Sequence, residues 1–451
     1  MKVCKFGGSS VASAGQIRKV CDIVVADPKR KIVVVSAPGK RSKDDIKVTD
    51  LLIECAEARL DGRSADEPLA AVIGRFDSIC IELGVDKAVA ESITDNLRTI
   101  VLGDTSHAGR YLDSVKAAGE DNCARVVAGE LRNLGLDASY VNPGDAGLLL
   151  SDDYGNARLL PESGAKLAQL RDAKGIVVFP GFFGYTLEGE VVTFSRGGSD
   201  ITGSILSAAV GAEVYENFTD VDSVLAADPS IVPNAAPVAE TTFREMRELS
   251  YAGFGVLHDE AIIPAVRAGI PICIKNTNAP TLPGTMIVPE RVKVASRVVG
   301  IAGNDGFCAV YVRKYLMNRE IGFGRKLLQI FEEEGISFEH APSGIDDMSV
   351  IIREKDFSVE TEKLVYNRIM NELNADNISV ERGLAMIMVV GEGMHYEVGL
   401  AAQVLQAFSD AKVNVEMINQ GSSEISMMFG IKSEDLNRSI VSLHKSFFEE
   451  M

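Results

Sequence analysis

The sequence lacks several patterns that would place it in other protein classes. Its seven cysteines are scattered and include no Cys-x-x-Cys pair, which argues against a disulfide framework or a zinc site and favours reduced thiols. No apolar run reaches the roughly 20 residues that a membrane-spanning helix needs, and the N-terminal strand and turn are too short for a signal peptide. We therefore expect a cytoplasmic protein without a membrane partner.

The chain also carries fewer positive than negative charges. The formal net charge is −18, which argues against a nucleic acid or an anionic membrane as the partner. The chain has 451 residues, of which 46% are hydrophobic and 24% are charged, so we expect a buried core and two or three domains. If the substrates are anions, the cations that bind them must be placed locally.

The two common nucleotide-binding motifs are missing as well. Gly39-Lys40 lacks the upstream glycine of a P-loop, and Gly322-Phe323-Gly324 is not continued to Gly-x-Gly-x-x-Gly. Neither a P-loop nor a Rossmann site is therefore expected.

What the sequence does contain is an alternation of strands and helices over residues 1–290. Residues 3–6 predict a short strand and residues 32–35 a continuous β-branched one. Apolar positions at helical spacing lie between them, which predicts a βαβ unit. Residues 40–130 are mostly helical by pattern. Further strands are expected at 138–141, 176–179, 191–192, 213–218 and 272–275, and further helices at 201–210, 243–257 and 262–268. The pattern predicts an α/β domain with an open, mainly parallel sheet between helices.

From residue 298 the pattern changes and repeats itself with an offset of 77 residues. Each copy has the pattern strand, helix, strand, turn, strand. The matched pairs are Gly322 and Gly399, Leu328 and Leu405, Phe331 and Phe408, Glu339 and Glu416, Gly344 and Gly421, and Ser349 and Ser426. We expect two small α+β modules, at residues 298–380 and 384–451, that pack against each other.

Residues 193–202 predict a strand, a glycine-rich turn and a helix start, where unpaired N–H groups attract anions. Gly197 and Gly198 allow close approach to the main chain, and Arg196 adds donors suited to a carboxylate or phosphate. Asp200 adds a negative charge, so the site would handle an anion and a cation together. Alternatively, Arg196 and Asp200 form only an ion pair within the loop.

Lys5 precedes Gly7-Gly8-Ser9-Ser10 at the end of a strand, a place from which its ammonium could reach a phosphate. The alternative is an ordinary solvated lysine. Thr219 and Asp220 could likewise form a plain turn with capping residues, and Lys275 could be a solvated residue at a strand edge.

These motifs together resemble the aspartate kinases. The matching segments, in family order, are Lys5-Phe-Gly-Gly-Ser-Ser, Phe194-Ser-Arg-Gly-Gly-Ser-Asp200, Thr219-Asp-Val-Asp222, Ala227-Asp-Pro229 and Val256-Leu-His258. The two repeats, with Ser423-Glu-Ile-Ser426, resemble the paired ACT modules of that family, which are ferredoxin-like. The resemblance covers essentially the whole chain, and without a dinucleotide fingerprint we expect a monofunctional enzyme, not a fusion to homoserine dehydrogenase.

The resemblance implies phosphorylation of the side-chain carboxylate of L-aspartate by ATP with Mg²⁺, the first step towards lysine, threonine and methionine. The catalytic residues would be Lys5, which neutralises charge on the γ-phosphoryl group, and Asp200, which orients Lys5 or other groups and does not act as a base. The implied substrate ligands are Arg196 for the α-carboxylate, Glu130 for the ammonium, and Thr49 and Ser199 for further hydrogen bonds. The implied nucleotide ligands are Lys5, Gly7, Gly8, Ser9, Thr219, Asp220 and Lys275; no protein metal ligand is identified.

The chemistry of the acceptor supports this mechanism. A side-chain carboxylate with an ordinary pKa of ~3.9 is already ionised at neutral pH and needs no general base. Catalysis would therefore rest on positioning and charge neutralisation. Many relatives carry a tyrosine and an arginine on the nucleotide loop where this chain has Leu225 and Ser230, so those contacts are in question.

The resemblance also implies feedback regulation by an end-product amino acid bound between ACT modules, and a homodimer or homotetramer formed through them. Lysine is favoured over threonine because two carboxylates suit a cationic side chain. The implied effector residues are Met317, Gly322, Phe323, Glu339, Asp347 and Ser349. Two alternatives stay open: a kinase for another carboxylate such as glutamate, and a non-catalytic amino-acid sensor.

Overall fold

The computed structural model describes residues 1–195, 197–255, 259–291, 297–421 and 425–449. The chain divides into two compact units. Unit 1 comprises residues 1–224, 237–246 and the described part of 255–291, and unit 2 comprises residues 225–236, 247–254 and the described part of 292–451. No helix among the described residues is long and apolar enough to cross a membrane.

Unit 1 is built on an eight-stranded sheet of order β3-β4-β2-β1-β7-β9-β10-β8. Its neighbouring strands are parallel except for β9 and β10. The strands are β1 (Lys2–Phe6), β2 (Arg30–Val35), β3 (Ala138–Tyr140), β4 (Ile176–Pro180), β7 (Val214–Thr219), β8 (Glu240–Thr242), β9 (Ile272–Asn276) and β10 (Thr285–Val288), and a separate hairpin pairs β5 (Phe183–Tyr185) with β6 (Val191–Thr193). Residues 32–35 of β2 and 176–179 of β4 are continuous apolar runs rich in β-branched residues, as expected for strands covered on both faces.

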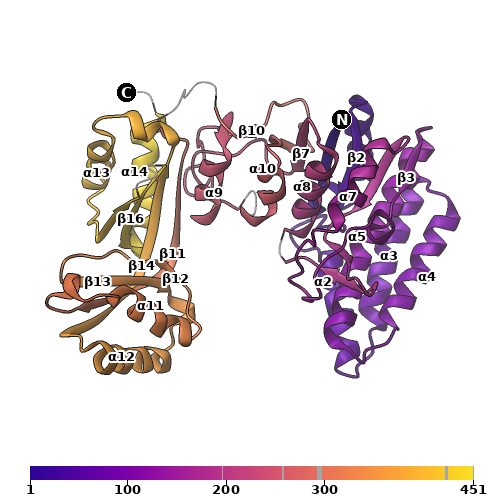
Figure 1. Cartoon of the computed structure of the whole chain (residues 1–451). Coiled ribbons are helices and arrows are strands. Elements are labelled where there is room, and N and C mark those ends of the chain that lie inside the picture. Colours follow the sequence, from indigo (N-terminus) through magenta and orange to yellow (C-terminus); the bar gives the residue numbers. More distant parts are fainter. Residues whose placement is uncertain (196, 256–258, 292–296, 422–424, 450–451) are drawn as a thin grey trace. The chain divides into compact units, whose positions relative to one another are not determined.

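Helices surround this sheet. Figure 1 shows the long α3, α4 and α5 side by side, and their apolar faces share one core with α1, α2 and the sheet. The helices are α1 (Ala14–Ala26), α2 (Val48–Leu60), α3 (Asp66–Leu83), α4 (Lys87–Val101), α5 (Ala108–Asn133), α6 (Pro143–Ala146), α7 (Ser163–Leu167), α8 (Gly198–Val210), α9 (Phe243–Tyr251) and α10 (Ile263–Arg267). The open, mainly parallel α/β sheet predicted from the sequence is confirmed.

Two details of the prediction for this region were wrong. The short strands β8, at the edge of the sheet, and β10, next to it, were not predicted, because three or four residues carry too little periodicity to stand out. Helix α9 ends at Tyr251, before the predicted residue 257, and Gly253 follows with a φ of 116°. Only glycine adopts such a backbone readily, so the chain leaves the helix there.

Unit 2 contains a six-stranded antiparallel sheet of order β12-β13-β11-β14-β16-β15. Its strands are β11 (Gly300–Arg313), β12 (Phe338–His340), β13 (Asp347–Arg353), β14 (Asn377–Val390), β15 (Met417–Gln420) and β16 (Ser426–Lys432). Its helices are α11 (Phe323–Glu333), α12 (Val359–Leu373), α13 (Leu400–Asp410) and α14 (Leu436–Phe448).

The two repeats share their long strands. Residues 307–313 of β11 pair with the first half of β14, and residues 300–304 pair with its second half. One core lies around α11 and α12, and the other around α13 and α14 and includes Ile301. The predicted pair of packed α+β modules is thus confirmed, but each module also contains a second helix, α12 or α14, that the sequence pattern had not shown.

The repeat offset holds for the helices and changes for the strands. Helix α13 begins 77 residues after α11, at 400 against 323, and Gly322 and Gly399 precede them with φ angles of 79° and 90°. Strands β15 and β16 begin 79 residues after β12 and β13, at 417 against 338 and at 426 against 347. The second module therefore carries two extra residues between helix and strands.

Candidate active site

The candidate site lies in unit 1 at the carboxyl ends of the parallel strands, the edge where open α/β sheets bind ligands. Lys5 is the penultimate residue of β1, and its Nζ lies 2.6 Å from Oδ1 of Asp200 in the first turn of α8. Asn217 of β7 donates a hydrogen bond of 2.8 Å to the same oxygen. The structure thus joins two predicted residues from segments almost 200 positions apart.

The loop after β1 makes close main-chain contacts. The N–H of Gly7 donates to the carbonyl of Phe218 at 3.1 Å, and a Cβ added at Gly7 would lie 3.6 Å from Lys5 Nζ. The carbonyl of Gly8 accepts from the N–H of Gly39 at 2.9 Å, and a Cβ at Gly39 would lie only 2.7 Å from the Gly8 carbonyl carbon. Ser9 is exposed beside them. This backbone lies beside the Lys5 ammonium, as a phosphate-lining loop requires.

The start of α8 is the predicted anion-binding turn. Gly197 has a φ of 76° at the N-cap and, being glycine, has no side chain to cap the helix. Ser199 packs against Gly181, where an added Cβ would lie 2.6 Å from the Ser199 Oγ, so the loop after β4 touches the helix start. Arg196, predicted to bind the substrate carboxylate, lies outside the described residues, as do Val256 to His258.

A buried carboxylate that sequence reasoning missed lies close to Lys5. Glu120, in the middle of α5, is 5% exposed, and its Oε2 has no hydrogen-bond partner within the described part of the chain. Burial raises the pKa of Glu120 to about 8, against a lowering by a backbone hydrogen bond from Ala37 and by the charge of Lys5. An unsatisfied buried carboxylate of this kind is typical of a binding site for a cation. Nothing in the local sequence of α5 distinguishes it.

Glu130, the residue predicted to hold the substrate ammonium, is not brought to this site. It lies ten residues further along α5, which is about 15 Å along the helix axis. Its Oε2 accepts a long hydrogen bond of 3.5 Å from Asn133, and burial, followed by the charge of Glu130, raises the pKa of the Cys21 thiol on α1. Glu130 therefore lies apart from Glu120 on α5, and Glu120 is the glutamate whose pKa, raised by burial, the charge of Lys5 lowers.

Thr49 lies in the first turn of α2, next to the loop that follows β2. The N–H of Val48 donates to the carbonyl of Pro38 at 3.0 Å, and a Cβ added at Gly119 would lie 2.7 Å from the Cβ of Ala37. The start of α2, this loop and the Glu120 turn of α5 therefore pack together, and Thr49 belongs to the same neighbourhood as Glu120.

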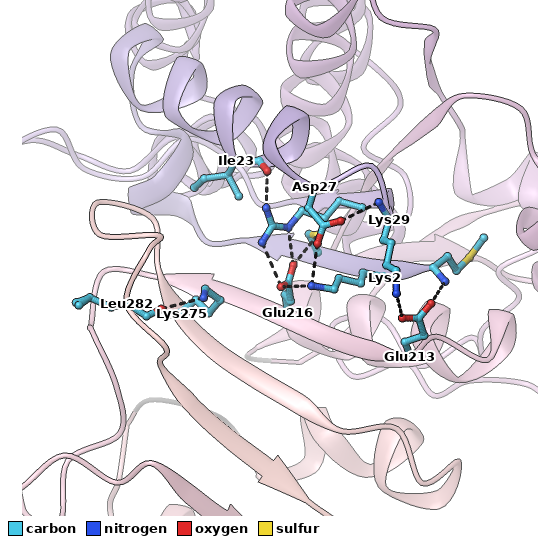
Figure 2. Close-up of polar contacts among 11 residues, drawn as sticks. Lys2, Ile23, Asp27, Lys29, Glu213, Glu216, Lys275 and Leu282 are labelled. Atoms are coloured by element: carbon cyan, nitrogen blue, oxygen red, sulfur yellow. Dashed lines mark hydrogen bonds and ion pairs between the residues drawn. The ribbon is translucent and has the colours of Figure 1, made fainter.

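Of the other predicted nucleotide ligands, Thr219 and Asp220 lie at the edge of the sheet that carries the candidate site, and the side chain of Lys275 is turned away from it. Thr219 ends β7, its Oγ1 donates to Oδ1 of Asp220 at 3.2 Å, and both lie at the carboxyl edge. In the strand register Lys275 lies beside Phe218 of β7, whereas Lys5 lies beside Asn217 of the same strand. Neighbouring residues of a strand point to opposite faces, so the two lysines lie on opposite faces of the sheet. Figure 2 shows Lys275 turned to the carbonyl of Leu282, which its Nζ reaches at 2.9 Å.

The face opposite Lys5 carries a separate ion network (Figure 2). Glu216 on β7 accepts from Arg30 at 2.6 Å and from Lys2 at 3.1 Å, and Lys2 also pairs with Asp27 at 2.9 Å. Cys4 Sγ lies 3.5 Å from Glu216, and burial, followed by the charge of Glu216, raises the pKa of this thiol. Two cations and two carboxylates balance one another, so this network is structural.

In unit 2, most of the predicted effector residues gather where β11 ends and α11 begins. Met317 and Phe323 are buried in one core, and Gly322 is the N-cap of α11. Asp347 lies opposite Arg313 in the register of β13 and β11, at the end of β11. Ser349 lies two residues further along β13.

Glu339 lies elsewhere. Its strand β12 pairs with residues 351 and 352 of β13, which lie about 15 Å along the strand from Asp347. Its carboxylate is held by Arg353 at 2.9 Å and by the hydroxyl of Tyr251. The structure does not bring Glu339 to the other five residues.

Residues 225–236, which follow the predicted nucleotide ligands Thr219 and Asp220 in the chain, belong to unit 2. Leu225, Ala227 and Val232 join the core around α13 and α14. The N–H of Ser230 donates to Asp228 at 2.8 Å. Leu225, where the family resemblance implies a tyrosine, is therefore a partly buried residue that packs against this core.

This fold and this arrangement of Lys5, Asp200 and glycine loops define an amino acid kinase. The model of the amino acid kinase family matches residues 1–276, and an ACT domain model matches residues 387–447. The chain is 55% identical to Aspartokinase 3 of Bacillus subtilis over 448 residues, 99% of both chains, and 29% identical to Aspartokinase 1, chloroplastic, of Arabidopsis thaliana, over 99% of this chain and 80% of that one.

Solved structures give the same result. The crystal structure of Clostridium acetobutylicum aspartate kinase is similar with a TM-score of 0.86 and 37% identity, over 99% of this chain and 100% of that one. The fold is also that of E. coli aspartokinase III in complex with aspartate and ADP, with a TM-score of 0.78 and 24% identity over the whole of both chains. The chain belongs to the aspartokinase family, and it is a kinase that carries ACT modules.

Proposed function

We propose that the protein transfers the γ-phosphoryl group of ATP to the side-chain carboxylate of L-aspartate, giving 4-phospho-L-aspartate and ADP. The observation that carries this proposal is the Lys5–Asp200 ion pair of 2.6 Å beside the Gly7–Gly8 backbone. In this pair Asp200 fixes the Lys5 ammonium in place, and the ammonium supplies positive charge where two anions must meet. The names of the relatives in Bacillus subtilis and Clostridium acetobutylicum support the same substrate.

In this mechanism a carboxylate oxygen of aspartate attacks the γ-phosphorus of ATP as the bond to the β–γ bridging oxygen breaks. The acceptor is already ionised at neutral pH, so no base is required. Lys5 would neutralise charge on the γ-phosphoryl group, and Asp200 would hold the Lys5 ammonium in place. Glu120 would receive the ammonium of aspartate, with Arg196, Thr49 and Ser199 as the other substrate ligands.

Mg²⁺ would accompany the nucleotide. Magnesium is usually held by substrate phosphates together with one or two carboxylates, so a dedicated protein cage is not required. Asp220 at the end of β7 is exposed, and Asp222 follows it, with its Oδ1 accepting from Asn276 at 2.6 Å. These oxygen donors at the nucleotide edge suit the ion.

Trapping of the acyl phosphate with hydroxylamine tests the proposal. We expect an aspartyl hydroxamate that requires aspartate, ATP and Mg²⁺, and no comparable product with glutamate. A product with glutamate and none with aspartate would favour the alternative carboxylate kinase, and no turnover with any amino acid would favour a non-catalytic sensor.

For regulation, the proposal is that L-lysine binds at Met317, Gly322, Phe323, Asp347 and Ser349 and lowers the activity. Its effect could reach the kinase unit through residues 225–236, which follow Thr219 and Asp220 in the chain and belong to the α13–α14 core. The N–H of Ala236 also donates to Nε2 of His444 on α14 at 3.2 Å. Movement of this module would therefore pull on the chain next to the nucleotide.

The regulatory site can be tested with a matched pair of carboxylates. Asp347→Asn should raise the lysine concentration for half-inhibition roughly tenfold or more, the effect of a lost charged contact. Glu339→Gln should change it little, since Arg353 and Tyr251 occupy that carboxylate. Equal effects of the two substitutions, or none from Asp347→Asn, would refute this placement.

Three expectations complete the proposal. The chain would work in the cytoplasm, and it would form a homodimer or homotetramer through its ACT modules. The functional domains would be residues 1–290 for the kinase and residues 298–380 and 384–451 for the two ACT modules.

A further inference from the structure

A buried arginine outside the reaction centre holds one of the loops that build it. Arg75 lies on α3, and its side chain is 5% exposed. Arginine is rarely buried unless its charge is paired and its donors are used. One guanidinium nitrogen of Arg75 donates to both carboxylate oxygens of Asp45, at 2.7 and 2.9 Å, and to the carbonyl of Ile46 at 3.2 Å. The other donates to the carbonyl of Gly39 at 3.1 Å.

All of these acceptors lie on one loop, residues 39–46, which connects the end of β2 to the start of α2. A groove of about 400 Å³ lies beside these contacts, and it is lined by residues 41 and 44–46 of the loop, by Leu51 of α2 and by residues 71, 74, 75 and 78 of α3. Arg75 therefore tethers this loop to the helix by polar contacts at several points along it.

Both ends of the same loop reach the candidate site. At its start, Gly39 donates to Gly8, with no room for a side chain between them. Just before it, the backbone of Ala37 binds the carboxylate of Glu120. At its end the chain enters α2, whose first turn holds Thr49. Movement of the loop would therefore shift Glu120 and Thr49 together.

Arg41 offers a comparison within the same cluster. It also binds Asp45, with its backbone N–H at 2.8 Å and its Nε at 2.9 Å, but its side chain is 51% exposed. Arg41 lies on the loop itself and so cannot attach the loop to α3. A lysine at position 75 could meet Asp45, but it lacks the planar fork that reaches two carbonyls at the same time.

We propose that Arg75 is a positioning residue for aspartate binding: through Asp45, Gly39 and Ile46 it holds the 39–46 loop so that Thr49 and Glu120 face the substrate. The inference rests on the proposed function, because it assigns the loop to the aspartate side of the site.

The test compares Arg75→Gln, Arg75→Lys and Arg41→Gln in the full-length chain. A misplaced substrate ligand can cost tenfold or more, so for Arg75→Gln we expect a rise of about tenfold or more in the KM for aspartate. The KM for ATP should change by less than about threefold, and Arg75→Lys should lie between the wild type and Arg75→Gln. Arg41→Gln should match the wild type within about twofold.

Hydrogen exchange of residues 39–47 provides a second measurement that does not depend on turnover. Exchange should become faster in Arg75→Gln and stay unchanged in Arg41→Gln. If Arg75→Gln does not fold, the KM values and the hydrogen exchange can be measured on Arg75→Lys and Asp45→Asn instead. A lower melting temperature with unchanged KM values, or unchanged exchange in the loop, would overturn the inference. If the wild type makes no aspartyl phosphate, it is the proposed function that fails, and the exchange result still decides whether Arg75 holds the loop.

Discussion

The two faces of strand β1 carry the same kind of residue in opposite circumstances. Lys2 lies on one face within a closed network in which Arg30, Asp27 and Glu216 cancel its charge. Lys5 lies on the other face and pairs with Asp200, near a buried Glu120 whose Oε2 lacks a partner within the described part of the chain. Because its charges balance, the first face is structural. Because the Oε2 atom of Glu120 lacks a hydrogen-bond partner among the described residues, the second face is available to ligands.

The largest expected effect comes from removing the lysine of the open face. Lys5→Ala should lower kcat on the order of 10³-fold, the scale for loss of a group that stabilises transition-state charge. Lys2→Ala should leave kcat within about twofold of wild type, because its network lies on the other face. Steady-state kinetics measures both, and circular dichroism checks that Lys5→Ala remains folded. Equal losses of kcat in the two variants would erase the distinction between the faces.

The next effect concerns the unpaired carboxylate. Glu120→Gln should raise the KM for aspartate roughly ten- to hundredfold, since a hydrogen bond to a charged group contributes about 1.5–3 kcal/mol. Glu130→Gln is the matched control on the same helix, and its KM should stay near that of wild type. A larger effect at Glu130 than at Glu120 would restore the placement predicted from the sequence.

The same carboxylate predicts a pH dependence. Because burial raises the pKa of Glu120 to about 8, the free enzyme holds this group protonated at neutral pH. The KM for aspartate should therefore fall as the pH rises from 6.5 to 8.5, when the carboxylate that attracts the ammonium forms. A profile of KM against pH that keeps this slope in Glu120→Gln would assign it to another group. The raised pKa also means that Glu120 lowers the stability of the folded state as the pH rises from its ordinary pKa of ~4.5 to about 8.

The smallest effect on turnover is expected on the face that carries the Lys2 and Glu216 network. A substitution there should lower the stability of the fold instead. Glu216→Gln should leave kcat within about twofold and lower the free energy of unfolding by about 3 kcal/mol, as when one partner of a buried ion pair is removed. Urea unfolding measures this change. A variant with normal stability and impaired turnover would place Glu216 in the reaction.

The pKa of Glu216 gives the sign of its pH dependence. Burial alone would raise that pKa, but Arg30 and Lys2 lower it below the ordinary value of 4.5. The group therefore stabilises the fold above pH 4.5, and this contribution is lost as the pH falls through the lowered value. Urea unfolding of Glu216→Gln between pH 7 and pH 3 should show less loss of stability on acidification than the wild type.

Local patterns predicted much of this molecule. The central β-branched strands, the glycine turn before α8 and the two helices that repeat after 77 residues all depend on short-range periodicity or on residue types with fixed backbone preferences. The same reasoning missed β8 and β10, because strands of three or four residues resemble loops. It also missed α12 and α14, because the repeat was aligned only through its better-matched parts.

The sequence by itself determined which segments could bind phosphate and carboxylate: glycines and a lysine at the end of β1, and a glycine turn with Asp200 at the start of α8. Only the tertiary structure decided which glutamate of α5 faces Lys5, which face of the sheet Lys275 takes, and that Arg75 holds the loop before Thr49. Those choices depend on strand register and on the rotation of packed helices. Both are set by contacts between residues far apart in the chain, which no local pattern encodes.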